Sequence, residues 1–507
     1  MRFTEQVEKL ILKCKKRNKI LKSMAWKEWG SKLESLRTLY IQYTGTCMEY
    51  ASSSWAPWIA PTNLEKLQVV QREALRAIVG LTKDCPKDFL YLEAGIEPLG
   101  ERFNKIDEIL WDKYLRLPQE DARHRLVTTP ITEPRLTTRH GFRYRTHSRI
   151  DNTLCRAPIC PPLPPWLIHD NLKIHYTPLT KPKSKYLKSE LLRISMDCIS
   201  TFQADINIYT DGSTNDNQEN GGAGVYIESD GMEIARIIKP AGKYCASYGG
   251  EIVALLEAMK WIENSEKECQ HQLTILIATD SKSLTDAMKH PDWKNSEYWM
   301  HETRKVISRI SSCIHLLWIP SHCDTPGNEK ADDLAKLGSE MSQEGVPITQ
   351  DIIKAKIKSR PWTITHARAL ETFGERRIPR TDVEKTWPKP VRTLYAQLRS
   401  GHCMELKWYR HFINIEEDDL CEECSKPETI EHVLLDCSRT DALRQKFWGG
   451  KEEEDVNTSL LTSEPDTCRR ILSSIFSELT IKESQNENLT LCSDSNRGGA
   501  RLGAPSS

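Results

Sequence analysis

The chain has 507 residues, of which 38% are hydrophobic, 28% charged and 7% aromatic. This is ordinary globular composition for about three domains, and it excludes a collagen-like or wholly disordered chain. No stretch approaches the roughly 20 consecutive apolar residues that a membrane helix requires. Lysines interrupt the short apolar run near the N-terminus, so we expect neither a membrane anchor nor a secretory signal.

Cysteine usage points to a reducing compartment. The 16 cysteines are scattered without a regular framework, and two of them form a C-x-x-C pair. This pattern is typical of reduced thiols and a metal site rather than of a disulfide scaffold. We therefore expect the protein in the nucleus or the cytoplasm.

The net charge of zero hides a segregation of charge along the chain. Residues 1–200 carry a net +12, residues 201–340 a net −9, and residues 341–507 a net −3. A basic segment is the usual electrostatic footprint of a protein that binds polyanions. A net negative charge does not attract polyanions, so the concentration of carboxylates in the acidic domain requires another explanation.

Residues 1–125 are expected to form a helical region, because apolar residues recur at helical spacing between Leu64 and Ile78 and Gly80 follows as a stop signal. Within it, KCKKRNK (13–19) is typical of a nuclear address, a phosphate-binding patch or a solvated helix face.

Residues 126–202 are rich in proline and arginine and predict an extended linker. Five arginines in this segment interleave with His140, Phe142 and Tyr144, a composition suited either to phosphate contacts and base stacking or to a solvated loop. These arginines are Arg135, Arg139, Arg143, Arg145 and Arg149.

The pattern changes to strands and helices over residues 203–340. Strands are predicted in INIYTDGS, GGAGVYIES, MEIARIIKP, LTILIATDS and CIHLLWIPSHC, and helices in between and after them. The order predicts an α/β domain, with a mixed five-stranded sheet flanked by helices. Residues 341–395 resemble a helical connector, residues 396–450 a small module around the C-x-x-C pair, and residues 451–507 a mostly disordered tail.

Four carboxylates of the α/β domain occupy positions where the fold could gather them. Asp211 follows the first strand, Glu251 opens the first helix, Asp280 ends the fourth strand, and Asp332 lies on the last helix. Carboxylates brought that close repel one another unless cations neutralise them. Oxygen ligands suit Mg²⁺ or Mn²⁺, and two such ions about 4 Å apart serve in-line phosphodiester hydrolysis. Each acid taken alone could equally be a solvated surface residue.

The sequence motifs around these acids resemble those of a known family. YTDGS (209–213), the helix that begins with Glu251, TDS (279–281) and WIPSHCDTPGNEKADDLA (318–335) resemble the type I ribonuclease H domains of jockey-like non-LTR retrotransposons. The resemblance implies the ribonuclease H-like fold, with Asp211, Glu251, Asp280 and Asp332 as ligands of two Mg²⁺ or Mn²⁺ ions. It also implies His322 as a proton shuttle on a mobile loop, with supporting roles for Ser213, Ser281, Asn328 and Glu329.

Two positions depart from that family. Asp324 stands where such elements usually carry glycine, which adds a charge and a side chain beside His322. Gly249 and Gly250 precede Glu251, and each weakens a helix start by up to about 1 kcal/mol. Neither departure removes a ligand.

The flanking regions resemble the same elements. Residues 40–80 and LEAGIEPL resemble the segment that follows the polymerase core in these retrotransposons, yet the aromatic-x-Asp-Asp turn of the polymerase is absent from the sequence. The chain therefore resembles a C-terminal fragment without the reverse transcriptase core, which a separately encoded reverse transcriptase could partner.

A Cys3His motif lies in the C-terminal module. Its spacing is Cys421-x2-Cys424-x7-His432-x4-Cys437, and it resembles the zinc knuckle of the same elements. Three thiolates and an imidazole supply the four tetrahedral ligands of a structural Zn²⁺ site, and a segment with so small a core would gain stability from the ion. The alternative is four unligated side chains.

These observations predict an endoribonuclease that hydrolyses the RNA strand of RNA–DNA hybrids by two-metal-ion catalysis. A noncatalytic nucleic-acid-binding protein that retains the ribonuclease H fold is the first alternative. A nuclease of the related transposase or exonuclease type is the second alternative, although the sequence motif around His322 disfavours it.

Overall fold

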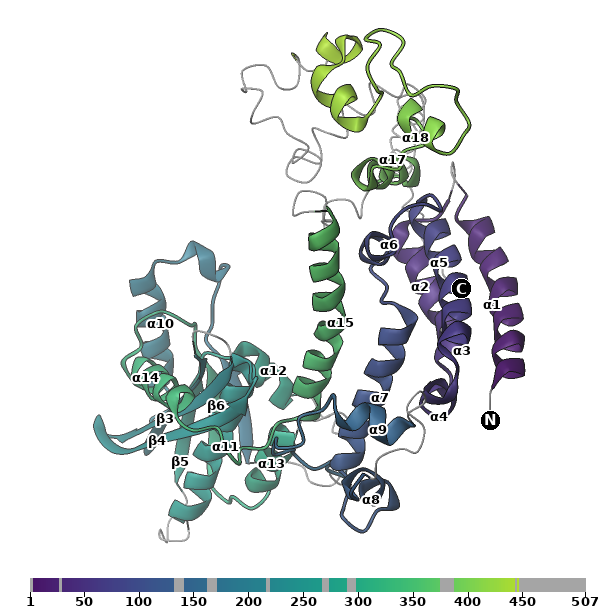
Figure 1. Ribbon diagram of the computed structural model, residues 1–507. Helices are drawn as coiled ribbons and strands as arrows, with labels where there is room; N and C mark the ends of the chain where they lie inside the picture. The colour runs from purple at the N-terminus through teal and green to yellow at the C-terminus, as the bar shows by residue number, and fades with distance from the viewer. Residues whose placement is uncertain are drawn as a thin grey trace, which may run out of the picture. The chain divides into compact units, whose positions relative to one another are not determined.

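A six-stranded mixed sheet organises the α/β part of the protein, which we describe from a computed structural model (Figure 1). The strand order is β1-β6-β5-β2-β3-β4. Strand bounds are Leu172–Tyr176 for β1, Ile206–Thr214 for β2, Asn220–Ser229 for β3, Met232–Lys243 for β4, Thr274–Thr279 for β5 and Cys313–Trp318 for β6. The structure describes residues 3–26, 30–131, 141–161, 171–215, 219–266, 273–289, 298–373, 387–442 and 445.

The sheet has a parallel half and an antiparallel half that meet at β2. Strand β2 pairs antiparallel with β3, which pairs antiparallel with β4, whereas β2–β5, β5–β6 and β6–β1 are parallel. The carboxyl ends of β2 and β5 therefore lie side by side at one edge of the sheet, which is where ligands bind in many open α/β sheets.

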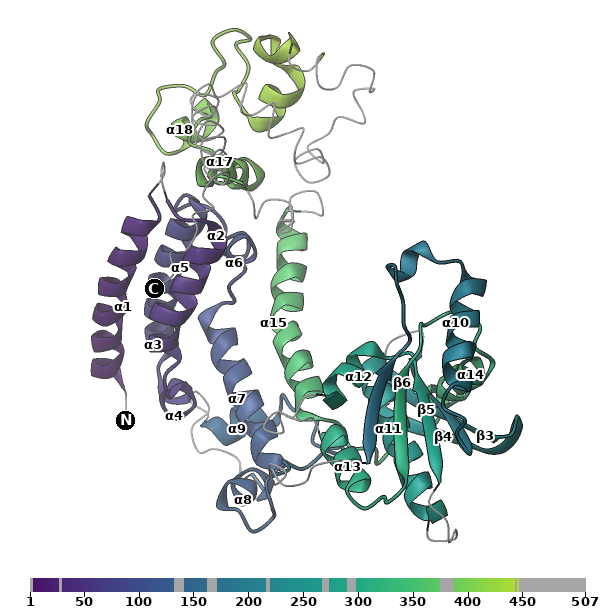
Figure 2. The ribbon, with the colours of Figure 1, turned by 180° about the vertical axis from the view of Figure 1, so that it is seen from behind.

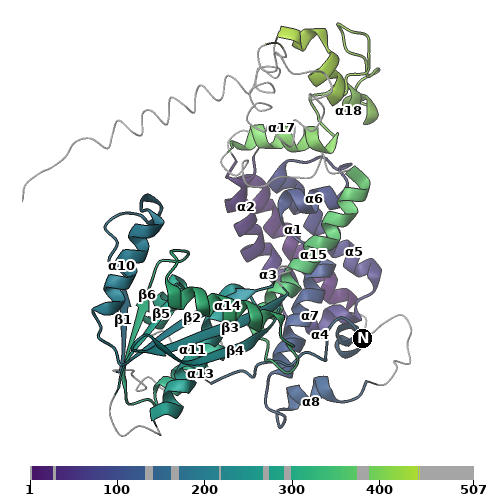
Figure 3. The same ribbon diagram turned by 90° about the vertical axis from the view of Figure 1, so that its left-hand side faces the viewer.

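Helices cover both faces of this sheet (Figure 3). On one face, α11 (Ser247–Glu266), α12 (Lys282–Lys289) and α13 (Tyr298–Ile307) build the main apolar core with residues such as Ile208, Ile277 and Leu316. On the other face, α10 (Lys188–Ser200) and α14 (Pro326–Glu340) cover a second core around Tyr209 and Leu317. The α/β fold expected for residues 203–340 is thus present.

The sheet exceeds the expected five strands by one. Strand β1 pairs along its length with β6, and α10 contributes Ile199 to the core on the neighbouring face. Both elements come from residues 126–202, which we expected to be an extended linker. The strand LKIHY is too short and too polar to be recognised alone, and it forms because β6 offers an unpaired edge.

The rest of this unit surrounds the sheet. It comprises residues 108–133 and 143–357, including part of α7 (Leu99–Leu115), α8 (Ala122–Thr128), α9 (Phe142–His147) and part of α15 (Gln350–Phe373). A buried ion-pair network joins three of its segments. The guanidinium groups of Arg116 and Arg156 donate to the Asp112 carboxylate at 2.7 and 2.9 Å, and Arg116 Nη1 also donates to the carbonyls of Ala157 and Ile348.

A second compact unit is helical and combines the two ends of the described chain (Figure 2). Its apolar core packs the amphipathic helix α5 against its neighbours. The helices are α1 (Thr4–Met24), α2 (Leu33–Leu39), α3 (Thr46–Glu49), α4 (Ser52–Trp55), α5 (Pro61–Val79), α6 (Lys87–Ala94), the first half of α7, most of α15, α17 (Lys389–Ser400) and α18 (Lys407–Phe412), with a π-helical turn, η1 (Tyr40–Gly45), between α2 and α3.

Helix α17 docks on the N-terminal helices of this unit. Gln397 Nε2 donates to the carbonyl of Gly80 at 2.7 Å, and the buried guanidinium of Arg399 pairs with the buried carboxylate of Glu93 at 2.7 Å. The Lys389 ammonium donates to the carbonyls of Ala25 and Ala77. Helix α17, which leads into the C-terminal module, is therefore bonded to the helical region.

Among the described residues, no helix combines the length and the apolar character required to span a lipid bilayer. The tail expected over residues 451–507 lies outside the described residues.

Candidate active site

Two of the expected carboxylates lie where the pairing of the parallel strands β2 and β5 ends. Thr210 of β2 pairs with Thr279 of β5, and Asp280 follows the end of β5. Asp211 does not follow its strand as we expected: β2 continues to Thr214, and Asp211 pairs with Gly224 of β3. Asp211 is 7% exposed, and its Oδ1 accepts a 2.7 Å hydrogen bond from the amide of Gly212. The carbonyl of Asp280 accepts a hydrogen bond from the indole of Trp318 at 3.1 Å, which fixes the backbone there.

Glu251 does not open the helix as we expected, because α11 begins earlier, at Ser247. It reaches the same place because the first turns of α11 lie very close to β2. A Cβ atom at Gly212 would lie 2.1 Å from the amide nitrogen of Glu251, and one at Gly250 would lie 2.5 Å from the carbonyl oxygen of Gly222. Both distances are too short for any residue but glycine. Gly250, which we expected only to weaken the helix start, is thus what lets the Glu251 side chain approach Asp211.

The three carboxylates form one buried cluster. Ligand oxygens of Asp211, Glu251 and Asp280 all lie within 4.8 Å of one another. Burial and then the neighbouring Asp280 and Asp332 raise the pKa of Asp211 to about 7. Burial, followed by Asp211 and Asp280, raises the pKa of Glu251 well above its usual range, and burial also raises that of Asp280.

This cluster fits a divalent cation. Glu251 is 5% exposed, and its Oε2 has no hydrogen-bond partner among the described residues. A buried carboxylate oxygen without a donor costs free energy, as does mutual repulsion of three acids. Oxygen-only ligands of this kind suit Mg²⁺ or Mn²⁺.

Asp332 stands beside this cluster rather than within it. It lies on α14, which packs unusually close to β3, since a Cβ at Gly222 or Gly224 would lie 2.0–2.1 Å from backbone oxygens of α14. The carboxylate is partly exposed and pairs with Lys336 at 2.6 Å. Its charge nonetheless raises the pKa of both Asp211 and Asp280.

The loop before α14 carries His322 and Asp324, and both residues have left-handed backbone conformations, with φ of 56° and 59°. Both side chains are exposed, whereas Cys323 between them is buried and its Sγ contacts the carbonyl of Pro320 at 2.9 Å. The Asp324 carboxylate pairs with Lys188 of α10 at 2.6 Å. The charge that departs from the family pattern therefore has its own partner.

Lys183 is a residue of this site that the sequence analysis missed. Its Nζ donates to Ser321 Oγ at 2.5 Å, next to His322, and its charge lowers the pKa of Asp280 against the stronger effect of burial. Lys183 belongs to a short turn in the presumed linker. Only the pairing of β1 with β6, which was not predicted, carries this turn to the acidic edge of the sheet.

Comparison with known proteins agrees with this geometry. Residues 203–340 match the RNase H family model. These residues form an RNase H domain. Ribonuclease H of Dichelobacter nodosus is 29% identical over 143 residues, covering 26% of this chain and 89% of that protein. Ribonuclease H of Legionella pneumophila is 29% identical over 153 residues, covering 27% and 96%, and that of Maricaulis maris is 26% identical over 145 residues, covering 26% and 92%.

Two solved structures of LC11-RNase H1 also match the RNase H domain. One is the complex of that enzyme with an RNA/DNA hybrid, with 19% identity, a TM-score of 0.23, and coverage of 27% of this chain and 96% of that one. The other, of the enzyme isolated from compost, has 19% identity, a TM-score of 0.24 and the same coverage.

The four residues expected to support the RNase H site have distinct surroundings. Ser213 is half-buried on β2, opposite Gly222 of β3. Ser281 immediately precedes α12, where its amide donates to Thr279 Oγ1 and its carbonyl accepts from Thr285. Asn328 is buried, with an Oδ1 atom that has no partner among the described residues, and Glu329 is exposed.

The Cys3His motif closes into a second cluster, in the helical unit. Ligand atoms of Cys421, Cys424, His432 and Cys437 lie within 4.8 Å of one another, and the Cys437 sulfur is 3.7 and 3.8 Å from those of Cys421 and Cys424. Zinc–sulfur bonds of about 2.3 Å in a tetrahedron place sulfurs about 3.8 Å apart. His432 is 5% exposed, and neither ring nitrogen has a partner among the described residues. The donor set and spacing fit Zn²⁺.

Three of the five arginines expected to contact nucleic acid lie among the described residues. Arg135 and Arg139 lie outside the described residues. Arg143 and Arg145 lie on α9. Arg143 donates to the carbonyl of Thr129 at 2.5 Å, and Arg149 lies 3.8 Å from the Glu108 carboxylate.

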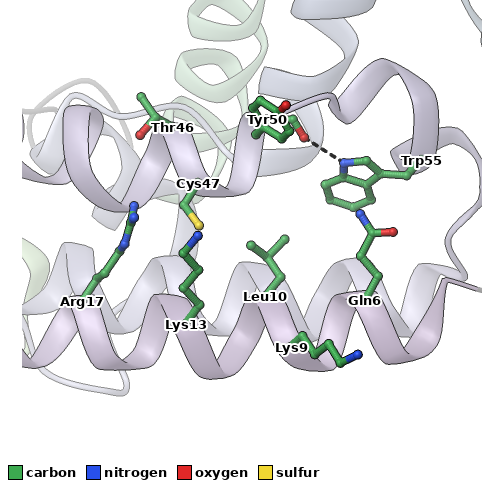
Figure 4. Close-up of a pocket in the computed structure, with 9 residues that line it drawn as sticks. All are labelled: Gln6, Lys9, Leu10, Lys13, Arg17, Thr46, Cys47, Tyr50 and Trp55. Carbon is green, nitrogen blue, oxygen red and sulfur yellow. Dashed lines mark hydrogen bonds between the residues drawn. The ribbon is translucent and has the colours of Figure 1, made fainter.

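A basic pocket lies instead in the helical unit, beside α1 (Figure 4). Its volume is about 480 Å³. In Figure 4 Lys13 and Arg17 point from α1 toward the segment that carries Thr46 and Cys47, whereas Lys9 points away from that segment and pairs with Glu5 at 2.6 Å. The lining residues are Gln6, Lys9, Leu10, Lys13, Arg17, Thr46, Cys47, Tyr50 and Trp55. The Tyr50 ring is 81% exposed, and Arg17 lies over the ring of Tyr43 at 4.4 Å.

Proposed function

We propose that the protein is a metal-dependent endoribonuclease that hydrolyses the RNA strand of RNA–DNA hybrids. The observation that carries this proposal is the convergence of Asp211, Glu251 and Asp280 at one buried edge of an RNase H domain. Hybrid substrate follows from the ribonucleases H that this domain resembles. A protein distinguishes RNA from DNA by contacts to the 2′-hydroxyl group.

Asp211, Glu251 and Asp280 would hold Mg²⁺ or Mn²⁺, with Asp332 as a further ligand released from Lys336. Two such cations supply activation of the attacking water and stabilisation of the leaving oxygen. His322, exposed on its loop near Asp280, moves a proton to or from the reacting groups, and Lys183 offers a positive charge to the scissile phosphate.

A cleavage assay with labelled hybrid tests the proposal. The full chain with Mg²⁺ or Mn²⁺ should cut the RNA strand of the hybrid and leave duplex DNA intact, and Asp280→Asn should abolish cleavage. Asp333→Asn is the matched control, because Asp333 is an exposed acid on α14. Cleavage of duplex DNA would favour the transposase or exonuclease alternative. Tight hybrid binding without metal-dependent cleavage would favour the noncatalytic alternative.

Three further features belong to the same proposal. Cys421, Cys424, His432 and Cys437 hold one structural Zn²⁺ ion, supported by their spacing and by the unpartnered His432 ring. The chain derives from a jockey-like retrotransposon, supported by the wording of its motifs, and works with a separately encoded reverse transcriptase. Its reduced cysteines suit the nucleus or the cytoplasm.

A further inference from the structure

A third cluster of metal-ligating side chains lies away from both sites described above. It joins Cys160, on the segment that follows α9, to His301 and Glu302 of α13. One ligand atom from each of the three residues lies within 4.8 Å of the other two. Cys160 and Glu302 are half-buried, whereas His301 is only 3% exposed. All three residues belong to the unit that contains the RNase H domain.

The surroundings of His301 fix which ring nitrogen is free. Its Nε2 lies 2.9 Å from the carbonyl oxygen of Pro161. A carbonyl only accepts hydrogen bonds, so Nε2 carries the proton and a neutral ring keeps its lone pair on Nδ1. A backbone carbonyl in this position is the usual support for a histidine that binds metal through its other nitrogen.

Nothing among the described residues satisfies that Nδ1 atom. It is buried and has no hydrogen-bond partner there, and the Glu302 Oε1 atom lies 3.5 Å from it. A nitrogen lone pair that faces a carboxylate oxygen is repulsive unless a proton or a cation lies between them. A buried polar atom left in that state destabilises the fold.

A metal ion explains more of the arrangement than a proton does. A proton on Nδ1 would make the buried His301 ring cationic beside Glu302, whose charge already has Lys305 as a partner at 2.9 Å. It would also give the Cys160 sulfur, whose hydrogen bond to the carbonyl of Pro158 is a long one of 3.9 Å, no reason to lie beside the ring. Thiolate, imidazole and carboxylate are together the donor set of Zn²⁺, which accepts three protein ligands and one water.

We propose that Cys160, His301 and Glu302 bind a zinc ion that fastens the segment before β1 to α13. Hydrogen bonds of the neighbouring residues hold this segment at one end. Ala157 donates its amide to Ile348 and accepts from Arg116, so this segment is held at one end by the buried ion-pair network. The zinc ion would hold its other end, at Cys160.

Zinc content of single variants tests this site. The full-length protein, purified without chelator, should lose one zinc per chain on Cys160→Ser and on His301→Gln, as measured by elemental analysis. Cys155→Ser is the matched control, since Cys155 is an exposed cysteine on the same segment outside the cluster, and it should lose none. Cys160→His, which restores a ligand, should keep the zinc.

The difference between the parent and Cys160→Ser decides the matter, whatever the total. If the Cys3His cluster also binds zinc, the content falls from two to one; if it does not, the content falls from one to none. Hybrid cleavage and circular dichroism should stay at the parent level in Cys160→Ser, which separates this test from that of the proposed function. Equal zinc in the parent and Cys160→Ser would overturn the proposal.

Discussion

The pKa of Asp211 makes stability depend on pH in a particular direction. Its folded value of about 7 lies above the value of about 3.9 expected in the unfolded chain. The protonated carboxyl therefore stabilises the folded state fully below about pH 3.9, and this contribution disappears as the pH rises through 7. Without divalent cations, we expect the free energy of unfolding of the RNase H domain to fall by up to about 4 kcal/mol between pH 4 and pH 8.

Asp211→Asn should remove much of that dependence, because the amide neither titrates nor repels Asp280. Hydrogen exchange of β2 and β5 in buffer free of Mg²⁺ and Mn²⁺ would follow the local stability at each pH. Asp333→Asn serves as the control and should retain the parent profile. An Asp211→Asn variant whose stability still falls as steeply with pH would mean that another group causes the pH dependence.

Asp324 tests whether a departure from the family pattern affects catalysis. Its carboxylate pairs with Lys188, so we expect Asp324→Gly to leave turnover close to the parent rate. Stability should change by less than about 1 kcal/mol, since relief of the left-handed backbone offsets the loss of an exposed ion pair. Single-turnover cleavage and urea unfolding would measure both. A marked gain in rate would mean that the carboxylate acts on His322.

At the scale of elements, the start of α11 positions the active site. Gly250→Ala would force a Cβ atom against the Gly222 carbonyl, which lies on an adjacent strand and cannot yield as a side chain would. We expect Glu251 to be displaced, hybrid cleavage to fall sharply and stability to fall by roughly 1–3 kcal/mol. Gly100→Ala, where the new Cβ would meet only side-chain atoms at 3.5 Å or beyond, should be tolerated.

Calorimetry and the cleavage assay would compare these two variants. Parent-like cleavage by Gly250→Ala would show that α11 can shift without consequence, and that the close approach of α11 to β3 does not determine the position of Glu251.

The elements that the sequence predicted well are those whose pattern is local. Strands β2 and β5 have alternating or continuous apolar residues before TDG and TDS, and their pairing up to Thr210 and Thr279 brings Asp211 and Asp280 close together. Strand β1 was missed because its five residues become a strand only against the edge of β6. Lys183 was missed with it, since its place near Asp280 depends on that pairing.

At the scale of the whole molecule, the Cys3His cluster is coupled to the helical unit. Ile430, Val433 and Leu434, from the cluster segment, pack in one core with Leu394 and Leu398 of α17. Helix α17 in turn bonds to Gly80 at the end of α5. The bond between α17 and α5 could not be predicted from the sequence, because more than 300 residues separate Gly80 from Gln397.

Cys424→Ser should therefore do more than release zinc. An incomplete set of ligands should loosen residues 421–437, and the exposed core should loosen α17 on α5, whereas hybrid cleavage should persist. Hydrogen exchange of α5 and α17 would detect this, with Glu423→Gln as a control on the same loop. Unchanged exchange in α17 would show that the cluster folds independently.

Hybrid affinity is the last property that belongs to the whole chain. The RNase H domain lies in the −9 part of the sequence and residues 1–200 carry +12, so we expect phosphate contacts mainly in the N-terminal part. Deleting residues 1–200 would not test this, because β1 and α10 would be lost from the sheet and its core. The test must therefore substitute charged side chains in the full-length protein.

The pocket beside α1 offers such a test. Its lining includes Lys13, the surface residue Lys9, which pairs with Glu5, and the exposed Tyr50, a composition suited to phosphate contact and base stacking. The double variant Lys9→Gln/Lys13→Gln should weaken hybrid binding and reduce the slope of log affinity against log salt by about 0.9 for every phosphate that is no longer neutralised. Lys15→Gln/Lys16→Gln removes the same charge from α1 outside the pocket and should have a smaller effect. Equal slopes for the two variants would mean that the net charge of the helix, rather than this pocket, attracts the hybrid.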